Sequence, residues 1–383
     1  MSIFNYKFDF IPLTDNLTNF EKDLSNLEKI RYLENPINFY KEAAYFKKID
    51  KKFTYYYLFS KIKSRDYIEG SGYLTHGFDF YQGSFHAQMI RGLINSCNLK
   101  KKSTILDPFC GCGTTLIESK LLNFNSIGID INPIACLNSK IKTELLDINI
   151  EILKNNNEKF FDLNYYSFLK EYENFFEILN LDIRTLFFIF LYTRAISDYY
   201  YISKNMNKAF IDNYHNILTT LLKFNILKKS IDLPMGKTKI YHSDNLKRLH
   251  QLKSNSIDAI ITSPPYIDLI DYISNDLNQI KIFLNESQIK YLRLFSIGNK
   301  FSKFSQTEKI YWYKMERVFY KLFDILKSNH HFILIIGDYK NMKEKFLNLS
   351  KKIGFKTERI LLRKIINKKD RISYEHVLFL LKV

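Results

Sequence analysis

The stretch STILDPFCGCGTTLIESKLLNFNSIGIDIN, residues 103–132, decides the fold. It predicts a short apolar strand over 103–109, a glycine-rich turn, a helix over 114–123 and a second strand over 126–132. Another helix is predicted over 133–146. Strands that alternate with helices in this way predict a parallel sheet with right-handed crossovers. We therefore expect an α/β protein.

The same alternation returns near residue 238 and continues to the end of the chain. It predicts a helix over 311–329, a buried strand over 331–339 and a closing pair of strands over 356–366 and 374–383. The sheet should thus be doubly wound and mostly parallel, ending in an antiparallel hairpin. We divide the chain into an N-terminal extension, a catalytic domain in two parts and a helical insertion between them: 1–70, 71–140 with 236–383, and 141–235.

Composition favours a polyanionic partner. The 383 residues carry a formal charge of +17, and 46% of them are hydrophobic, which excludes a disordered chain. A basic excess of this size is typical of nucleic-acid binding. The alternative is compositional bias, because Lys, Asn, Ile, Phe and Tyr are all abundant.

Compartment and metal content can also be read from the sequence. Cys110-Gly111-Cys112 has no partner pair or nearby histidine, so we predict no metal site. The N-terminus lacks the pattern of a signal peptide, and the most hydrophobic window, 186–192, is too short to cross a bilayer. We expect a reduced, cytoplasmic protein with no membrane contact.

The turn at 107–114 has the properties of a nucleotide-type site. Gly111 and Gly113 permit close approach of a ligand, and the helix that begins at Thr114 offers free N–H groups. Asp107 would repel a pyrophosphate but attract a cation, and Asp130 can bind ribose hydroxyls. These features fit S-adenosyl-L-methionine better than a dinucleotide. The alternative is a turn that serves helix–strand packing alone.

A third acidic side chain supports an adenosine ligand. Asp244 follows a strand and precedes Asn245 and Leu246. We expect its carboxylate to accept a hydrogen bond from the adenine amino group, while Leu246 or Ile131 packs on the ring. The alternative is that Asp244 only caps the next helix.

The strand over 257–262 leads into Ser263, Pro264, Pro265 and Tyr266. The Ser263 hydroxyl and the Pro264 carbonyl can both accept hydrogen bonds from an exocyclic amino group, which localises its lone pair towards a methyl donor. Tyr266 can stack on the base, and the prolines fix the direction of the carbonyl. This motif therefore predicts methylation of a base amino group.

These motifs resemble those of the amino-methyltransferases of DNA that act on N4 of cytosine or N6 of adenine. DPFCGCGT is similar to their cofactor motif and TSPPY to their catalytic motif, and GSFHAQMIRGLI (83–94) and RISYEHVLFLLK (371–382) extend the similarity. It covers roughly residues 80–135 and 238–383. The resemblance implies a Rossmann-like class I methyltransferase fold. It also implies cofactor contacts from the following residues: Phe85, His86, Asp107, Pro108, Phe109, Gly111, Gly113, Thr114, Asp130, Ile131, Asn132, Asp244, Asn245 and Leu246.

In that family a serine at the first motif position is associated with cytosine N4, so Ser263 favours cytosine; N6 of adenine is the alternative. The resemblance also implies a restriction-modification setting with a cognate restriction endonuclease. The insertion at 141–235 departs from the familiar layouts and is a candidate for target recognition. An RNA base methyltransferase and a non-catalytic DNA-binding module remain as alternatives.

A base within double-stranded DNA must be flipped out to reach Ser263. For the phosphate clamp we expect residues 47–63 and 284–309, with Arg293, Lys300 and Lys303 foremost. Asp268, Asp271 or Tyr272 should contact the base edge, unless they cap the next helix. Arg194 is a candidate DNA contact in the insertion, with core packing as its alternative.

Overall fold

The structure is a computed structural model of the whole chain. It describes residues 48–49, 52–53, 59, 62, 72–79, 83–100, 102–154, 178–202, 205–230, 233–267, 269, 271–298, 307–366 and 372–383. Most of the predicted extension 1–70 lies outside these ranges, as do the candidate DNA contacts Asp268, Lys300 and Lys303. Within the extension, β1 (Lys48–Ile49) and β2 (Lys52–Phe53) pair antiparallel.

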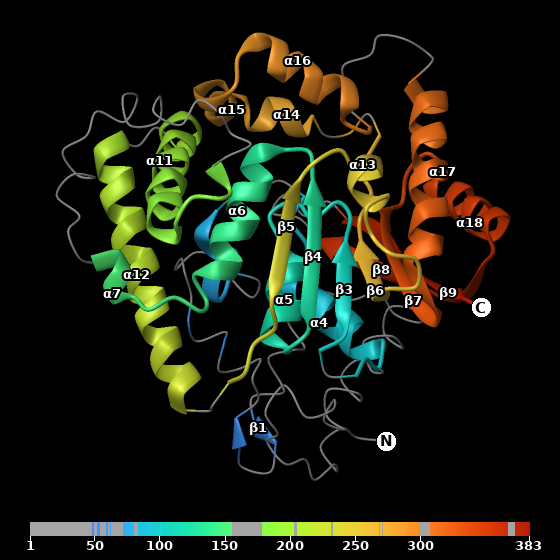
Figure 1. Cartoon of the computed structure of the whole chain (residues 1–383), viewed down its shortest axis with the longest axis horizontal. Coiled ribbons are helices and arrows are strands. Elements are labelled where there is room, and N and C mark those ends of the chain that lie inside the picture. The colour runs from blue at the N-terminus through green and yellow to red at the C-terminus, as the bar shows by residue number, and fades with distance from the viewer. Residues whose placement is uncertain are drawn as a thin grey trace.

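A seven-stranded sheet forms the centre of the molecule (Figure 1). Its order is β5-β4-β3-β6-β7-β9-β8. Neighbours from β5 to β7 are parallel, whereas β9 pairs antiparallel with both β7 and β8. The bounds are β3 (Thr104–Asp107), β4 (Asn125–Asp130), β5 (Thr238–His242), β6 (Ile257–Thr262), β7 (Leu326–Gly337), β8 (Phe355–Ile366) and β9 (Ile372–Lys382). The predicted doubly wound, mostly parallel sheet with a terminal antiparallel hairpin is confirmed.

Both faces of the sheet are covered by helices, which explains its continuous apolar strands. On β7, Ile333 and Ile335 face a core shared with α4 (Ala87–Ser96) and α5 (Thr114–Leu121). The alternate residues Phe332 and Leu334 face a second core. Its helices are α13 (Asn245–Leu249), α17 (Thr307–Ile325) and α18 (Met342–Ile353).

The predicted insertion, residues 141–235, shares a third apolar core with elements outside it. Its described helices are α7 (Glu151–Lys154), α11 (Ile183–Ile202) and α12 (Met206–Ser230). Tyr192 of α11 stacks on Phe210 of α12 with ring centroids 4.7 Å apart. The same apolar cluster includes residues of α6 (Pro133–Glu144) and α15 (Leu277–Phe283). The insertion is thus packed against the sheet's own helix α6.

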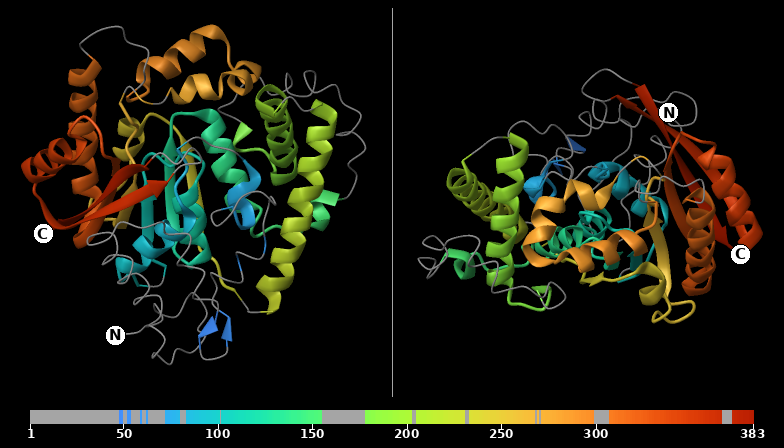
Figure 2. Two further views of the ribbon diagram at one scale, coloured as in Figure 1. Left: turned by 180° about the vertical axis from the view of Figure 1, so that it is seen from behind. Right: turned by 90° about the horizontal axis from the view of Figure 1, so that it is seen from above.

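The segment after β6 lies over the carboxyl ends of the parallel strands (Figure 1). It comprises α14 (Tyr272–Asn275), α15 and α16 (Glu286–Phe295). Figure 2 shows from above that these helices cross the end of the sheet between the insertion and the α17–α18 side. Ligands of open α/β sheets bind at this edge.

One predicted boundary is wrong. The helix expected over 311–329 ends at Ile325, and β7 begins directly at Leu326. Leu326 is fully buried and pairs with Ile257 of β6, while Asn329 adopts a φ of 61° that no helix accepts. Tertiary pairing therefore overrides the helical periodicity of this stretch.

Candidate active site

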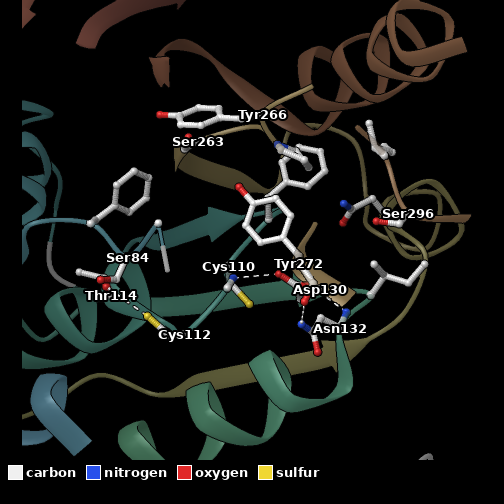
Figure 3. Close-up of a pocket in the computed structure, with 18 of the residues that line it drawn as sticks. Ser84, Cys110, Cys112, Thr114, Asp130, Asn132, Ser263, Tyr266, Tyr272 and Ser296 are labelled. Atoms are coloured by element: carbon white, nitrogen blue, oxygen red, sulfur yellow. Dashed lines mark hydrogen bonds between the residues drawn. The ribbon is translucent and has the colours of Figure 1, made fainter. Parts of the chain in front are cut away.

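A cleft opens at the carboxyl ends of β3, β4 and β6 (Figure 3). Its empty space is about 1120 Å³, counted out to the open mouth. Three groups of residues line it. From the predicted site come Phe85, Phe109, Gly111, Thr114, Asp130, Ile131, Asn132, Asp244, Asn245, Ser263, Pro265, Tyr266 and Tyr272. Unpredicted residues are Gly83, Ser84, Cys110, Cys112 and Ile273 near these motifs, and Phe295, Ser296, Ile297, Arg363 and Glu375 farther along the chain.

The glycine-rich turn is fixed by its contact with α6. Gly111 and Gly113 have φ values of 49° and 85°, a region that favours glycine. A Cβ on Gly113 would come within 2.8 Å of Ser139 Oγ. The Ser139 hydroxyl also donates to the Gly111 carbonyl at 2.6 Å. The turn therefore needs glycine both for its conformation and for its packing.

Asp130 is held at the tip of β4 by backbone groups. Its Oδ2 accepts from the Gly111 N–H at 2.9 Å, and its Oδ1 accepts from the Asn132 N–H at 2.8 Å. Burial raises the pKa of this carboxyl. The two bonds orient the carboxylate and connect it to the turn, and the Asp130 side chain lines the cleft (Figure 3).

Asp107 does not line the cleft. It is 1% exposed, and its Oδ1 accepts from the Thr262 hydroxyl at 2.6 Å and from the Phe109 N–H at 3.1 Å. Burial raises its pKa to about 6. This placement corrects the expectation that Asp107 meets a cationic ligand, because its carboxyl ties β3 to β6 inside the sheet. Pro108 and Gly113 likewise lie behind the lining residues.

Asp244 caps a helix, as its alternative interpretation expected, and it also reaches the cleft. It caps α13, where its Oδ1 accepts from the Lys247 N–H at 3.0 Å, and it lines the cleft. Of the two predicted ring contacts, only Ile131 lines the cleft, whereas Leu246 packs against the core below α17.

The catalytic motif is supported from several elements. The Tyr311 hydroxyl of α17 donates to the Pro265 carbonyl at 3.1 Å, and the Tyr266 ring meets Tyr339 edge-on at 5.8 Å. The Ser263 hydroxyl donates to the Pro264 carbonyl at 3.5 Å and also interacts with the Tyr266 side chain. Ser263 lies beside Tyr266 at the top of the cleft in Figure 3. The Pro265 carbonyl is thus occupied by Tyr311. Ser263 lines the cleft, whereas the predicted Pro264 is buried and is not among the lining residues.

The terminal hairpin contributes a charged pair that the motifs did not indicate. Arg363 and Glu375 lie opposite each other on β8 and β9 and form a 2.7 Å ion pair. The Tyr266 hydroxyl donates to the other Glu375 oxygen at 3.5 Å. Burial, aided by the Glu375 charge, raises the Tyr266 pKa well above its usual value. The sequence offered little signal for this pair, because β8 carries several other charged residues.

The segment before β3 is anchored through α5. Phe85 lines the cleft, but the neighbouring His86 is buried and caps α4, where its Nδ1 accepts from the Met89 N–H at 3.3 Å. Glu118 of α5, fully buried, accepts from the Tyr73 hydroxyl at 2.6 Å and from Arg91 Nε at 2.9 Å. These bonds bring Phe85 to the cofactor turn.

The described candidates for DNA contact differ in position: one lines the cleft, and the others bond to neighbouring side chains or backbone. Tyr272 lines the cleft, whereas Asp271 caps α14 through bonds to the Ser274 N–H and hydroxyl at 2.9 and 2.7 Å. Arg293 donates to the Ser274 hydroxyl at 3.2 Å. Arg194 is 4% exposed and pairs with Asp198 at 2.6 Å, which corrects the expected DNA contact in favour of core packing.

Metal-binding clusters and membrane-spanning helices are both absent from the described residues. Among them, no group of three or more histidine, cysteine or acidic side chains is arranged to hold a metal ion. No helix in the described part of the chain is both long and apolar enough to span a membrane.

The fold and the two motifs that meet in the cleft define a class I methyltransferase architecture. Residues 5–140 match the family model N6_N4_Mtase, described as DNA methylase. That segment includes the glycine-rich turn, starts well before residue 80 and stops short of Ser263. This match over residues 5–140 confirms the resemblance to the N6/N4 DNA methylases seen in the sequence.

Three curated proteins extend the comparison. Type II methyltransferase M.BsoBI of Geobacillus stearothermophilus is 27% identical over 277 residues, which cover 57% of this chain and 54% of that protein. Type II methyltransferase M.MjaII of Methanocaldococcus jannaschii is 32% identical over 118 residues, 29% of this chain and 22% of that protein. The tRNA (guanine(10)-N2)-dimethyltransferase of the same organism is 26% identical over 183 residues, 45% of this chain and 47% of that protein. The chain therefore spans about half, or less, of each relative's length.

Proposed function

We propose that this protein transfers a methyl group from S-adenosylmethionine to the exocyclic amino group of a DNA base, with N4 of cytosine as the favoured target. One observation carries the proposal. The glycine-rich turn with Asp130 lines one side of a single cleft, and Ser263, Pro265 and Tyr266 line the other (Figure 3), although the two lie more than a hundred residues apart in the sequence.

The β4 side of the cleft fits an adenosine-containing cofactor. The Asp130 carboxylate can accept from ribose hydroxyls, Ile131 offers an apolar surface for the ring, and Asp244 can accept from its amino group. Phe85 and Phe109 line the path towards the Ser263 side. Bound there, S-adenosylmethionine supplies an electrophilic methyl group.

The β6 side fits an amino group that must become nucleophilic. We expect Ser263 Oγ and the Pro264 carbonyl to accept the two N–H groups of the base amino group. The nitrogen lone pair then points from the β6 side of the cleft (the base wall) towards the β4 side (the cofactor wall). Tyr311 occupies the Pro265 carbonyl and so fixes the platform before the substrate arrives. The Tyr266 ring, supported by Tyr339, offers a face for stacking. The proton is released after transfer, so this scheme needs no strong base.

Ser263 at the first motif position supports cytosine N4 over adenine N6. A second candidate, methylation of a base in RNA, is supported by the likeness to the tRNA (guanine(10)-N2)-dimethyltransferase. Two curated relatives named type II methyltransferases support DNA as substrate and a cognate restriction endonuclease as partner. Entry of a base to Ser263 requires that it be flipped from the duplex.

The direct test uses labelled S-adenosylmethionine with mixed-sequence duplex DNA, and in parallel with transfer RNA, followed by mass spectrometry of the nucleosides. We expect N4-methylcytosine from DNA. N6-methyladenine would retain the mechanism and change the target base. Label in RNA alone would establish the second candidate, and cofactor binding without transfer to either would contradict the proposal.

A salt titration tests the role of the basic surface. If the +17 charge binds DNA phosphates, the logarithm of the affinity should fall linearly with the logarithm of the salt concentration. A flat response would instead attribute the charge to compositional bias.

A further inference from the structure

Asp276 occupies a helix N-cap position without capping the helix. It precedes α15, and an aspartate there ordinarily accepts an N–H from the first turn. Its side chain makes no such bond. Instead, Oδ2 accepts from Asn132 Nδ2 at 2.6 Å, across 144 residues of sequence. The Asp276 carboxylate therefore bonds to the β4 side of the cleft instead of capping α15.

Asn132 uses both ends of its amide. It is 1% exposed, and its Oδ1 caps α6 by accepting from the Ile134 N–H at 3.0 Å. Its Nδ2 donates to Asp276 and, at 3.4 Å, to the Tyr272 carbonyl. Its backbone N–H is bound to Asp130. A single side chain thus connects the proposed ribose-binding tip of β4 to the segment that follows the catalytic motif.

Tyr272 is the residue that this connection places. Figure 3 shows its ring between Asp130 and Asn132 on one side and Ser263 and Tyr266 on the other. Burial raises the pKa of its hydroxyl to about 12, and the interaction of that hydroxyl with the Tyr266 backbone limits the rise. Tyr272 therefore spans the two walls of the cleft, with its backbone fixed at Asn132 and its hydroxyl at the catalytic motif.

We propose that Asp276 is a positioning residue that, through Asn132, holds Tyr272 across the cleft and so sets the spacing between the cofactor wall and the base wall. The inference deepens the proposed function and rests on it for its kinetic consequence. The anchoring itself is a property of the free protein. It makes the segment from Tyr272 to Phe283 a part of the active site although only its first two residues line the cleft.

Substitutions at Asp276 can distinguish the contribution of its acceptor oxygen from that of its negative charge. Asp276→Asn keeps an oxygen that can accept from Asn132, whereas Asp276→Ala removes it. The reciprocal pair Asn132→Asp with Asp276→Asn reverses donor and acceptor, and aspartate at 132 still caps α6. Asn132→Asp alone places two carboxyl groups face to face. A matched control is Glu286→Gln, an exposed acid in the first turn of α16 on the same segment.

Three readouts are combined: kcat and KM for duplex DNA at saturating cofactor, the Kd of S-adenosylmethionine by calorimetry, and amide hydrogen exchange of residues 271–283. We expect Asp276→Ala to lower kcat/KM for DNA about tenfold or more, because it leaves the buried Asn132 Nδ2 without its carboxylate partner. Exchange in 271–283 should accelerate. Asp276→Asn and the reciprocal pair should restore most of both, while Asn132→Asp should not.

The outcomes that overturn the inference are distinct from failure of the proposed function. Equal loss in Asp276→Ala and Asp276→Asn, or unchanged exchange in Asp276→Ala, would contradict the anchoring role. If Glu286→Gln had as large an effect as Asp276→Ala, loss of any acidic side chain on this segment would be enough to lower kcat/KM, and the specific role of Asp276 would be contradicted. If the wild-type protein methylated no DNA, the proposed function would fail, and the exchange data with the reciprocal pair would still decide whether Asp276 anchors the segment.

Discussion

On the β3–β4 side of the cleft the polar contacts come from one short run of sequence, whereas on the β6 side they come from separate elements far along the chain, α17 and β9. Asp130 is bound by Gly111 and Asn132, which lie 19 and 2 residues away. Tyr266 contacts Glu375, which is 109 residues away, and Pro265 contacts Tyr311, which is 46 residues away. The first wall is thus built by local backbone geometry and the second by tertiary packing.

This difference indicates which parts of the structure each wall needs in order to keep its geometry. A carboxylate held by two backbone N–H groups keeps its direction as long as the turn is folded. The Ser263 motif instead depends on α17, on β7 and on the terminal hairpin being in register. Substitutions on the β4 side should therefore affect cofactor binding, and those on the β6 side should affect transfer.

The largest effect is expected for Ser263→Ala. Loss of one oriented acceptor at the reacting amino group should lower kcat by about 100- to 1000-fold, by analogy with loss of one oxyanion-hole donor. The Kd of S-adenosylmethionine should be unchanged, since Ser263 lies on the base wall. Single-turnover methylation and calorimetry measure the two quantities. A parallel loss of cofactor affinity would break the separation of the two walls.

Asp107→Asn should stabilise the protein at neutral pH. The folded-state pKa is about 6 against an ordinary 3.8, so the contribution of this carboxyl is complete below pH 4 and is lost as the pH rises through 6. A shift of about two units corresponds to about 3 kcal/mol. Asparagine keeps an acceptor for Thr262 and removes the ionisation. Denaturant unfolding at pH 4 and pH 7.5 measures the difference, and a less stable variant at pH 7.5 would show that the ionised carboxylate is needed.

Asp130→Ala should weaken S-adenosylmethionine binding by about 10- to 100-fold, because it removes a charged acceptor and frees the Gly111 N–H. DNA affinity without cofactor should not change. Calorimetry and a DNA-binding titration test the two halves of this expectation. If Ser263→Ala weakened S-adenosylmethionine binding as much as Asp130→Ala, the assignment of Asp130 to the cofactor wall would be contradicted.

The smallest effect is expected for Glu375→Gln. The amide oxygen can still accept from Tyr266, but the ion pair with Arg363 is lost. We expect kcat to fall about fivefold, the range of a partly buried polar contact. Glu358→Gln, an exposed position on the same hairpin, is the control. A loss as large as that of Ser263→Ala would give Glu375 a direct part in the transfer.

The contrast between the walls also explains what the sequence could predict. The strands, the glycine turn and the Asp130 contacts follow from neighbouring residues, so 103–132 was sufficient to anticipate them. Arg363 and Glu375 pair only because β8 and β9 fold back in register, and no local pattern announces that register. Arg194 looked like a DNA contact among tyrosines, but its partner Asp198 lies one helical turn away and both are buried.

Acidic residues were the hardest to assign. Asp107, Asp130 and Asp244 all end strands or follow them closely, and sequence position alone made them equivalent. The fold separates them, because Asp107 points into the sheet towards Thr262 while Asp130 and Asp244 reach the cleft. The direction of a side chain at a strand end depends on the strand's phase against its neighbours.

The shared apolar core of α11, α12, α6 and α15 limits how this protein can be recombined with its relatives. A helical region with a separate hydrophobic core could be replaced by the corresponding region of a relative without disturbing the rest of the protein. Here the faces of α6 and α15 that receive the insertion also carry Asn132 and Asp276 at their ends. A chimera cut at 141 and 235 would leave both faces mismatched, and the first property to suffer would be the geometry of the cleft. Productive crossovers must keep these four helices together as one inherited unit.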